Sequence, residues 1–227
     1  MRIKKAETRG RSDFGWLDSR HSFSFGNYWD PEWVQYGPLR VINDDRVAGG
    51  GGFPSHPHRD MEIISIVLSG QLAHRDSMGN GATIGAGEIQ YMSAGSGIVH
   101  SEMNPSSDEP VHFLQIWIKP DRNGHAPAYG QTKVEPVAGE WIQVIGEADG
   151  AIPIRQDVNI HWGKTETGKP LNATAGTGRR AWLQIMEGEG IVNGESLQAG
   201  DAVLLENGES LHLDGNLNLL RFDLPAD

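Results

Sequence analysis

The sequence predicts an all-β fold built from many short antiparallel strands. Glycine (30 residues) and proline (12 residues) together make up about 18% of the 227 residues, against ~12% in average proteins. These residues are spaced between short apolar runs, which is typical of strands joined by turns. No amphipathic pattern with a helical period extends over ten residues or more. A sandwich or barrel of short strands is therefore expected.

The expected strands are short runs rich in β-branched or aromatic side chains, each followed within a few positions by Gly, Pro, Asn or Asp. The clearest runs are residues 39–42, 62–68, 88–92 and 111–118.

The chain also repeats itself weakly. A run that ends at Gly70 is followed by an expected hairpin and by the turn Ala86-Gly87-Glu88. Near the end of the chain, a run that ends at Gly188 is followed by an expected hairpin and by the turn Ala199-Gly200-Asp201. Two related β-domains explain this repetition better than one domain does.

The pattern breaks between Pro120 and Pro136. We therefore expect an N-terminal domain over residues 1–130 and a C-terminal domain over residues 131–227.

Composition excludes several classes of protein. Nineteen Lys and Arg residues against thirty Asp and Glu residues leave a net charge of −11, which argues against direct binding of nucleic acid. No apolar run approaches the ~18–20 residues that span a bilayer. The absence of cysteine excludes disulfides, thiolate metal sites and iron–sulfur clusters. Residues 1–7 are charged and lack the apolar stretch of a signal peptide, so we expect a soluble cytoplasmic protein, monomeric by default.

Three of the nine histidines fall in two short segments. His56 and His58 occupy alternate positions of one expected strand, and His100 and Glu102 occupy alternate positions of another, so each pair points to one side. If the two strands lie across a barrel lumen from each other, all four side chains converge. Three neutral imidazoles and a carboxylate suit a divalent metal such as Fe, Zn, Cu, Ni, Mn or Co. An octahedral metal with four protein ligands keeps two open positions, which is typical of a catalytic metal.

Glu62 is an alternative fourth ligand, because it lies four residues beyond His58 on the same face of a regular strand. Gly50, the two histidines and Glu62 fit the first motif of the cupin superfamily, Gly-x5-His-x-His-x3-Glu, in which that Glu is often a ligand. Residues 97–104 resemble the end of the second cupin motif, Gly-x2-His-x3-Asn, although Gly95 stands where that motif has proline. A single His-x-His pair is common in strands that bind no metal, and it is the second pair that favours a metal site.

A closer resemblance is to the pirin family of bicupins, and it covers residues 15 to about 118 densely. The segments that carry it are residues 15–19, 21–25, 39–45, 52–62, 76–80 and 100–104. The resemblance implies two tandem cupin barrels of the jelly-roll or double-stranded β-helix type. It also implies a metal-free second barrel, whose part of the chain has only two widely separated histidines, His161 and His212.

In that family three His and one Glu hold a single metal, usually iron. Carried over to this sequence, the ligands are His56, His58, His100 and Glu102, and the metal is most often Fe(II). Glu62 then lies behind the ligands or in the pocket.

The resemblance further implies a quercetin 2,3-dioxygenase, which uses O2 to open the central ring of a flavonol with loss of carbon monoxide. Glu102 is the expected catalytic base for the flavonol hydroxyl, with Glu62 as its substitute if Glu102 stays bound to the metal. The alternative function is an iron-dependent regulatory protein that binds a transcription factor or a metabolic enzyme. A cupin isomerase or sugar-binding module is a third, weaker alternative.

Overall fold

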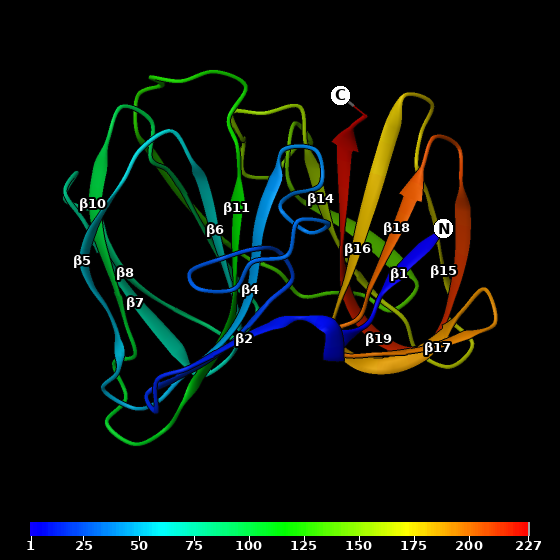
Figure 1. The fold of residues 1–227 in the computed structure, drawn as a ribbon, viewed down its shortest axis with the longest axis horizontal. Helices are drawn as coiled ribbons and strands as arrows, with labels where there is room; N and C mark the ends of the chain where they lie inside the picture. Colours follow the sequence, from blue (N-terminus) through cyan, green and yellow to red (C-terminus); the bar gives the residue numbers. More distant parts are fainter. Residues whose placement is uncertain (227) are drawn as a thin grey trace. The chain divides into compact units, whose positions relative to one another are not determined.

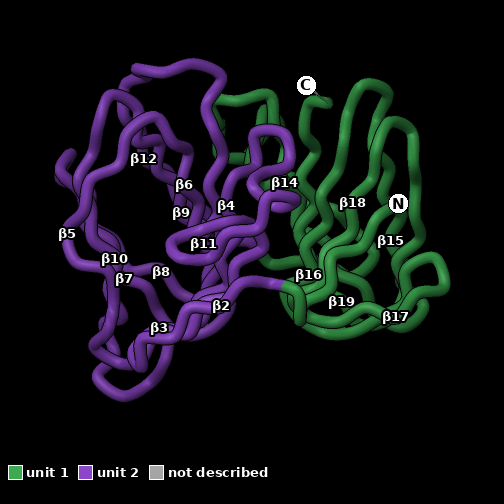
Figure 2. Tube along the Cα trace, viewed as in Figure 1, with its two compact units in different colours: residues 1–8, 135–227 green, residues 9–134 purple. Residues whose placement is uncertain are grey.

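The computed structural model describes residues 1–226, which form two compact units (Figure 2). One unit is Arg9–Val134, and the other combines Met1–Thr8 with Glu135–Asp227. These units are defined by the contacts that the chain makes within itself. The domains expected from the sequence, residues 1–130 and 131–227, stay a prediction.

Two antiparallel sheets make up the unit of residues 9–134 (Figure 1). The larger has seven strands in the order β12 (Ala128–Lys133), β9 (Glu88–Ser93), β6 (Glu62–Ser69), β11 (Val111–Ile118), β4 (Leu39–Val47), β3 (Leu17–His21) and β2 (Gly10–Asp13). The smaller has four strands in the order β5 (Gly52–His58), β10 (Ile98–Met103), β7 (Gln71–Asp76) and β8 (Gly81–Gly85). All four runs predicted from the sequence are strands of the larger sheet.

Strand β6 illustrates why these segments become strands. Its sequence EIISIVLS is rich in β-branched residues, and every residue from Glu62 to Val67 is buried. A strand that is covered on both faces reads as a continuous apolar run, because neither face needs to be polar. The polar residues Glu62 and Ser65 inside this run are exceptions that matter for the site described below.

The hydrophobic core of this unit lies between its two sheets. One cluster joins Leu72 and Ile84 of the smaller sheet to Val67 and Phe113 of the larger sheet. A second cluster brings Ile98 of β10 together with residues of β6 and β9. Burying each such side chain contributes about 1.5–3 kcal/mol, so the core holds the smaller sheet, which carries the candidate ligands, against the larger one.

The second unit is a single sheet of eight strands. Its main path is β1 (Arg2–Lys4), β18 (Ala202–Glu206), β16 (Arg179–Val192), β19 (Ser210–Pro225), β14 (Asn159–Lys164) and β13 (Glu140–Ile145). Off this path, β15 (Leu171–Thr174) pairs with β19, and β17 (Glu195–Gln198) pairs with β16. Strands β16 and β19 have 14 and 16 residues and pair along almost their whole length, so they form the spine of the unit.

The all-β prediction is confirmed. The described residues contain one helix, the three-residue 3-10 helix η1 (Ala6–Thr8). Within residues 1–226, no helix has the length and hydropathy that crossing a membrane requires.

Candidate metal centre

Three of the four predicted ligands, His56, His58 and His100, come together in the structure, while the carboxylate of Glu102 is not part of their group. The sequence left open how the two strands meet, with convergence across a barrel lumen as one condition under which the ligands would meet. In the structure, β5 and β10 are hydrogen-bonded neighbours in the smaller sheet, and His100 lies directly opposite His56. Directly opposed residues of an antiparallel pair point to the same face. Adjacency within one sheet therefore brings the histidines together.

The three imidazoles form a tight group. One ring nitrogen from each of His56, His58 and His100 lies within 4.8 Å of the others, and the Nε2 atoms of His56 and His100 are 3.0 Å apart. Two nitrogens that bind one metal at ~2.1 Å with a right angle between them are about 3.0 Å apart. The spacing therefore fits two adjacent positions on a metal ion.

A hydrogen bond from one ring nitrogen orients His56 for metal binding. Its Nδ1 lies 2.8 Å from the carbonyl oxygen of Pro54, which can only accept a hydrogen bond. The Nδ1 atom therefore carries the proton, and the lone pair is left on Nε2, which points toward His100.

His100 is oriented by a similar but longer chain of hydrogen bonds. The Nε2 of His74 lies 3.3 Å from a carboxylate oxygen of Asp76 and acts as its donor. The Nδ1 of His74 then accepts a hydrogen bond from the amide of Gln90 at 3.1 Å, and it lies 3.5 Å from the Nδ1 of His100. These contacts hold the ring of His100 with its Nε2 directed at His56.

The electrostatic environment keeps two of the imidazoles uncharged at neutral pH. Burial, reinforced by the neighbouring His56, lowers the pKa of His58 to about 4. Burial and the three neighbouring histidines lower the pKa of His100 to about 3. Because only a neutral imidazole binds a metal, the cluster needs no proton release at neutral pH before these two rings can act as ligands.

Glu102 lines the same cavity as His56 and His58, and its carboxylate is held by two hydrogen bonds. The register of β10 against β5 shifts after His100, so Glu102 lies opposite Phe53. Its carboxylate accepts hydrogen bonds from the Oγ of Ser65 (2.9 Å) and the Nε2 of Gln115 (2.7 Å). Burial raises the pKa of Glu102 above its usual value, although both hydrogen bonds act in the opposite direction.

Glu62 has a different environment. It is fully buried, and its carboxylate accepts hydrogen bonds from the hydroxyls of Tyr91 and Ser93, the latter at 2.7 Å. Among the described residues that line the cavity next to the histidines, Glu102 is present and Glu62 is not. Its role as a substitute base stays a prediction.

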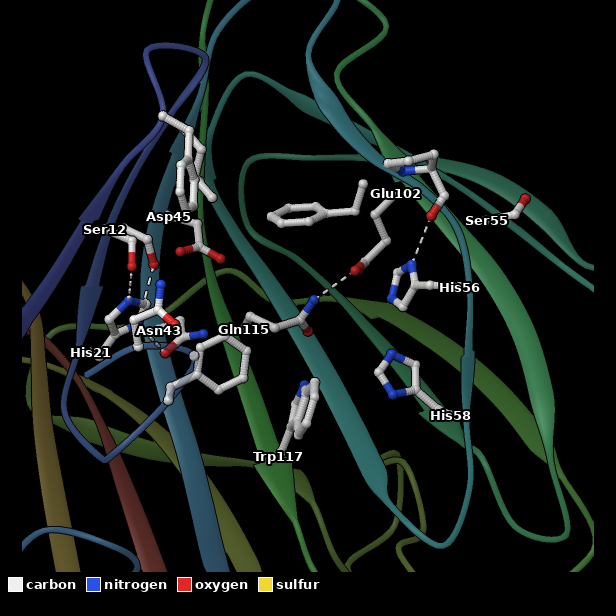
Figure 3. Close-up of a pocket in the computed structure, with 18 residues that line it drawn as sticks. Ser12, His21, Asn43, Asp45, Ser55, His56, His58, Glu102, Gln115 and Trp117 are labelled. Atoms are coloured by element: carbon white, nitrogen blue, oxygen red, sulfur yellow. Dashed lines mark hydrogen bonds between the residues drawn. The ribbon is translucent and has the colours of Figure 1, made fainter. Parts of the chain in front are cut away.

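A cavity of about 500 Å³ opens next to the histidines (Figure 3). His56, His58 and Glu102 lie at one end of it. Aromatic side chains form much of the wall: Phe14, Phe25, Phe53 and Trp117. The other end carries a polar group of residues: Ser12, Ser19, His21, Asn43 and Asp45.

Several residues that support the site were not predicted from the sequence. Ser65 and Gln115 hold Glu102, and His74 contacts His100. The signal was present for the first two, because each is a polar residue in the middle of an otherwise apolar strand. These two residues are also direct cross-strand partners in the larger sheet, and only the pairing of β6 with β11 reveals that.

Comparison with known proteins places this geometry in a family. A family model described as Pirin matches residues 2–118, and a model described as Quercetinase C-terminal cupin domain matches residues 142–224. The chain belongs to the pirin family. It is 44% identical to a protein of Escherichia coli O157:H7 named quercetin 2,3-dioxygenase, over 98% of both chains. The protein of the same name from Escherichia coli K12 is 43% identical, again over 98% of both chains.

Solved pirin structures have the same fold. Bacterial pirin YhhW from Escherichia coli matches with a TM-score of 0.93 and 42% identity, covering 100% of this chain and 98% of that one. The structure of YhhW in complex with nickel(II) matches with a TM-score of 0.94 and 39% identity, covering 100% and 99% of the two chains. The expectation of a bicupin of the pirin type is therefore confirmed, and a metal ion fits this pirin's three-histidine group.

Proposed function

We propose that this pirin is a metal-dependent dioxygenase that opens flavonols such as quercetin at a metal held by His56, His58, His100 and Glu102. The observation that carries the proposal is the convergence of three imidazoles, two of which, those of His56 and His58, line one end of a cavity with aromatic side chains in its wall. Relatives that are 43–44% identical over nearly the whole chain are named quercetin 2,3-dioxygenase, which supports the same reaction.

The three histidines suit several divalent metals, and we favour iron(II). When bound, the metal supplies Lewis acidity for the chelating oxygens of the flavonol and redox activity toward dioxygen. The aromatic wall of the cavity holds the planar rings of the substrate and excludes water from them. Trp117 contributes to this wall and also packs edge-on against His58, with ring centroids 5.0 Å apart.

Glu102 is the proposed base for the proton of the 3-hydroxyl group of the flavonol. It lines the cavity next to the histidines, and its buried carboxylate has a raised pKa, which makes it a better proton acceptor than an exposed carboxylate. Ser65 and Gln115 hold the carboxylate in position before the substrate binds. We assign the proton to Glu102 and not to Glu62 because Glu102 lines the cavity and Glu62 does not.

An aerobic assay with iron-loaded protein tests the proposal. We expect loss of quercetin together with release of carbon monoxide, and we expect His56→Ala to lower the rate at least ~100-fold because it removes a ligand. Metal content measured by elemental analysis should fall in the same variant.

The matched control is His161→Ala, which removes a histidine of the C-terminal unit and should leave both metal content and rate unchanged. Quercetin loss by the iron-loaded protein that does not exceed the loss with His56→Ala would overturn the proposal.

A further inference from the structure

The end of the cavity that lies away from the metal centre is built from an ordered hydrogen-bond network. The Nδ1 of His21 donates to the Oδ1 of Asn43 at 2.8 Å, because that amide oxygen can only accept. Its Nε2 then accepts from the hydroxyl of Ser12 at 2.9 Å. Burial lowers the pKa of His21, which is consistent with this neutral ring. The network fixes the wall but leaves one polar group unused.

That unused group is the carboxyl of Asp45. Asp45 is 3% exposed, lines the cavity and is hydrogen-bonded to Ser19, but its Oδ1 atom has no hydrogen-bond partner in residues 1–226. Figure 3 shows this carboxyl between the His21 network and the Glu102 end of the cavity. Leaving a buried polar atom unpaired costs about 1–3 kcal/mol, and such atoms call for an explanation.

The neighbouring carboxylate shows the contrast. Asp44 is paired with Arg9 at 3.1 Å, Arg46 at 3.0 Å and His112 at 2.7 Å. The same strand therefore carries Asp44, whose carboxylate is paired with basic side chains, and Asp45, whose carboxyl lines the cavity without such a partner. A missing partner for Asp45 is best supplied by a ligand in the cavity.

The lining of the cavity restricts the chemistry of that ligand. None of the described residues lining it is Lys or Arg, so a carboxylate or phosphate group next to Asp45 would be repelled without compensation. The four aromatic side chains of the wall favour a planar aromatic body. A hydroxyl group both donates and accepts a hydrogen bond, so it satisfies Asp45 whether or not that carboxyl is protonated.

We propose that Asp45 binds a phenolic hydroxyl at the end of the substrate remote from the metal, so that the cavity selects polyhydroxylated flavonols over flavonols without remote hydroxyls. This inference rests on the proposed function for the orientation of the substrate, with its chelating oxygens at the histidine end. Asp45 is then a residue that determines specificity, and it takes no part in the reaction at the metal.

The test compares two flavonols with the same chelating group. Quercetin carries remote hydroxyls, and 3-hydroxyflavone carries only the chelating hydroxyl. Affinities are measured by calorimetry without oxygen, so that no turnover occurs, with the nickel(II)-loaded protein and with the metal-free protein. We expect Asp45→Ala to weaken quercetin binding about tenfold and to change 3-hydroxyflavone binding less than twofold. Asp45→Asn keeps a donor and an acceptor and should restore most of the preference.

Ser55→Ala is the matched control, because it removes another polar side chain of the same cavity and should change both affinities by the same factor. Equal losses for both flavonols in Asp45→Ala would overturn the proposal. If that variant does not fold, the unmodified metal-free protein decides, since equal affinity for the two flavonols would also overturn it.

The two proposals fail in different ways. A protein that discriminates through Asp45 but does not consume quercetin in air refutes the dioxygenase function and leaves the subsite in place. A protein that consumes both flavonols equally well, with and without Asp45, refutes the subsite and leaves the dioxygenase function in place.

Discussion

At the scale of single residues, neighbouring carboxyls of β4 have opposite pKa shifts. Burial alone would raise the pKa of Asp44, but its hydrogen bond to His112 and the nearby arginines outweigh burial and lower the pKa to about 2. Burial raises the pKa of Asp45 to about 7, and the charges of Asp44 and Glu102 act in the same direction, against the hydrogen bond from Ser19. The difference arises because the cations lie on one side of the strand only.

This shift predicts a pH-dependent stability difference between the protein and Asp45→Asn. Between pH 4 and pH 7 the unfolded chain ionises Asp45 while the folded protein keeps it protonated, so the free energy of unfolding falls as the pH rises. Asn cannot ionise and escapes this loss. We therefore expect Asp45→Asn to gain stability relative to the unmodified protein, by on the order of a few kcal/mol, from pH 4 to pH 8.

Urea unfolding of both proteins at several pH values measures this difference. All other titrating groups are common to the two chains and largely cancel. A stability difference that stays constant from pH 4 to pH 8 would show that Asp45 titrates normally in the folded protein.

At the scale of elements, the sequence predicted which strands form but not how the ligand-bearing strands pair. The runs at residues 62–68 and 111–118 were readable because apolar, β-branched sequence is local information. The pairing of β5 with β10 depends on contacts about forty residues apart in the chain. Period-two alternation therefore showed which side chains share a face, while adjacency within one sheet, the support of Glu102 and the unpaired Asp45 required the three-dimensional structure.

Gly52 makes that pairing of β5 with β10 sensitive to substitution. It has a φ of +152°, and a Cβ atom there would lie 2.5 Å from the backbone oxygen of Glu102 and 2.7 Å from the Cα of Met103. Because both atoms belong to the backbone of β10, an added side chain must push the two strands apart. We expect Gly52→Ala to cost about 2–4 kcal/mol of stability and to weaken metal binding at least tenfold.

Gly79→Ala is the matched control, because Gly79 also has a positive φ (+92°) but no atom within 4 Å of the added Cβ. It should cost about 1 kcal/mol and leave metal binding unchanged. Isothermal titration with nickel(II) and urea unfolding measure both effects. Equal metal affinity in the two variants would contradict the role of strand pairing in bringing the ligands together.

At the scale of the whole molecule, the first residues of the chain complete the unit that begins at residue 135. Strand β1 pairs with β18, and Ile3 packs against the core of that unit. The buried carboxylate of Asp201 accepts a hydrogen bond from the backbone N–H of Ala6 at 2.7 Å and lies 3.5 Å from the Nζ of Lys5. Stability of residues 135–226 thus depends on residues at the opposite end of the chain.

Removal of residues 1–8 should therefore destabilise the C-terminal unit and spare the metal centre. The deletion exposes the edge of β18, removes Ile3 from the core against which it packs, and leaves the buried Asp201 with fewer partners. Together these losses should lower the free energy of unfolding by about 2–4 kcal/mol. For a unit of ~100 residues this lowers the melting temperature by roughly 10 °C or more. Hydrogen exchange should rise across residues 135–226, while nickel(II) still binds with unchanged affinity, since His56, His58 and His100 belong to the unit of residues 9–134.

Glu7→Ala, an exposed change in the same segment, should leave both measurements as they are. Faster exchange confined to residues 9–134 in the shortened chain would mean that the N-terminal segment stabilises the metal-binding unit instead.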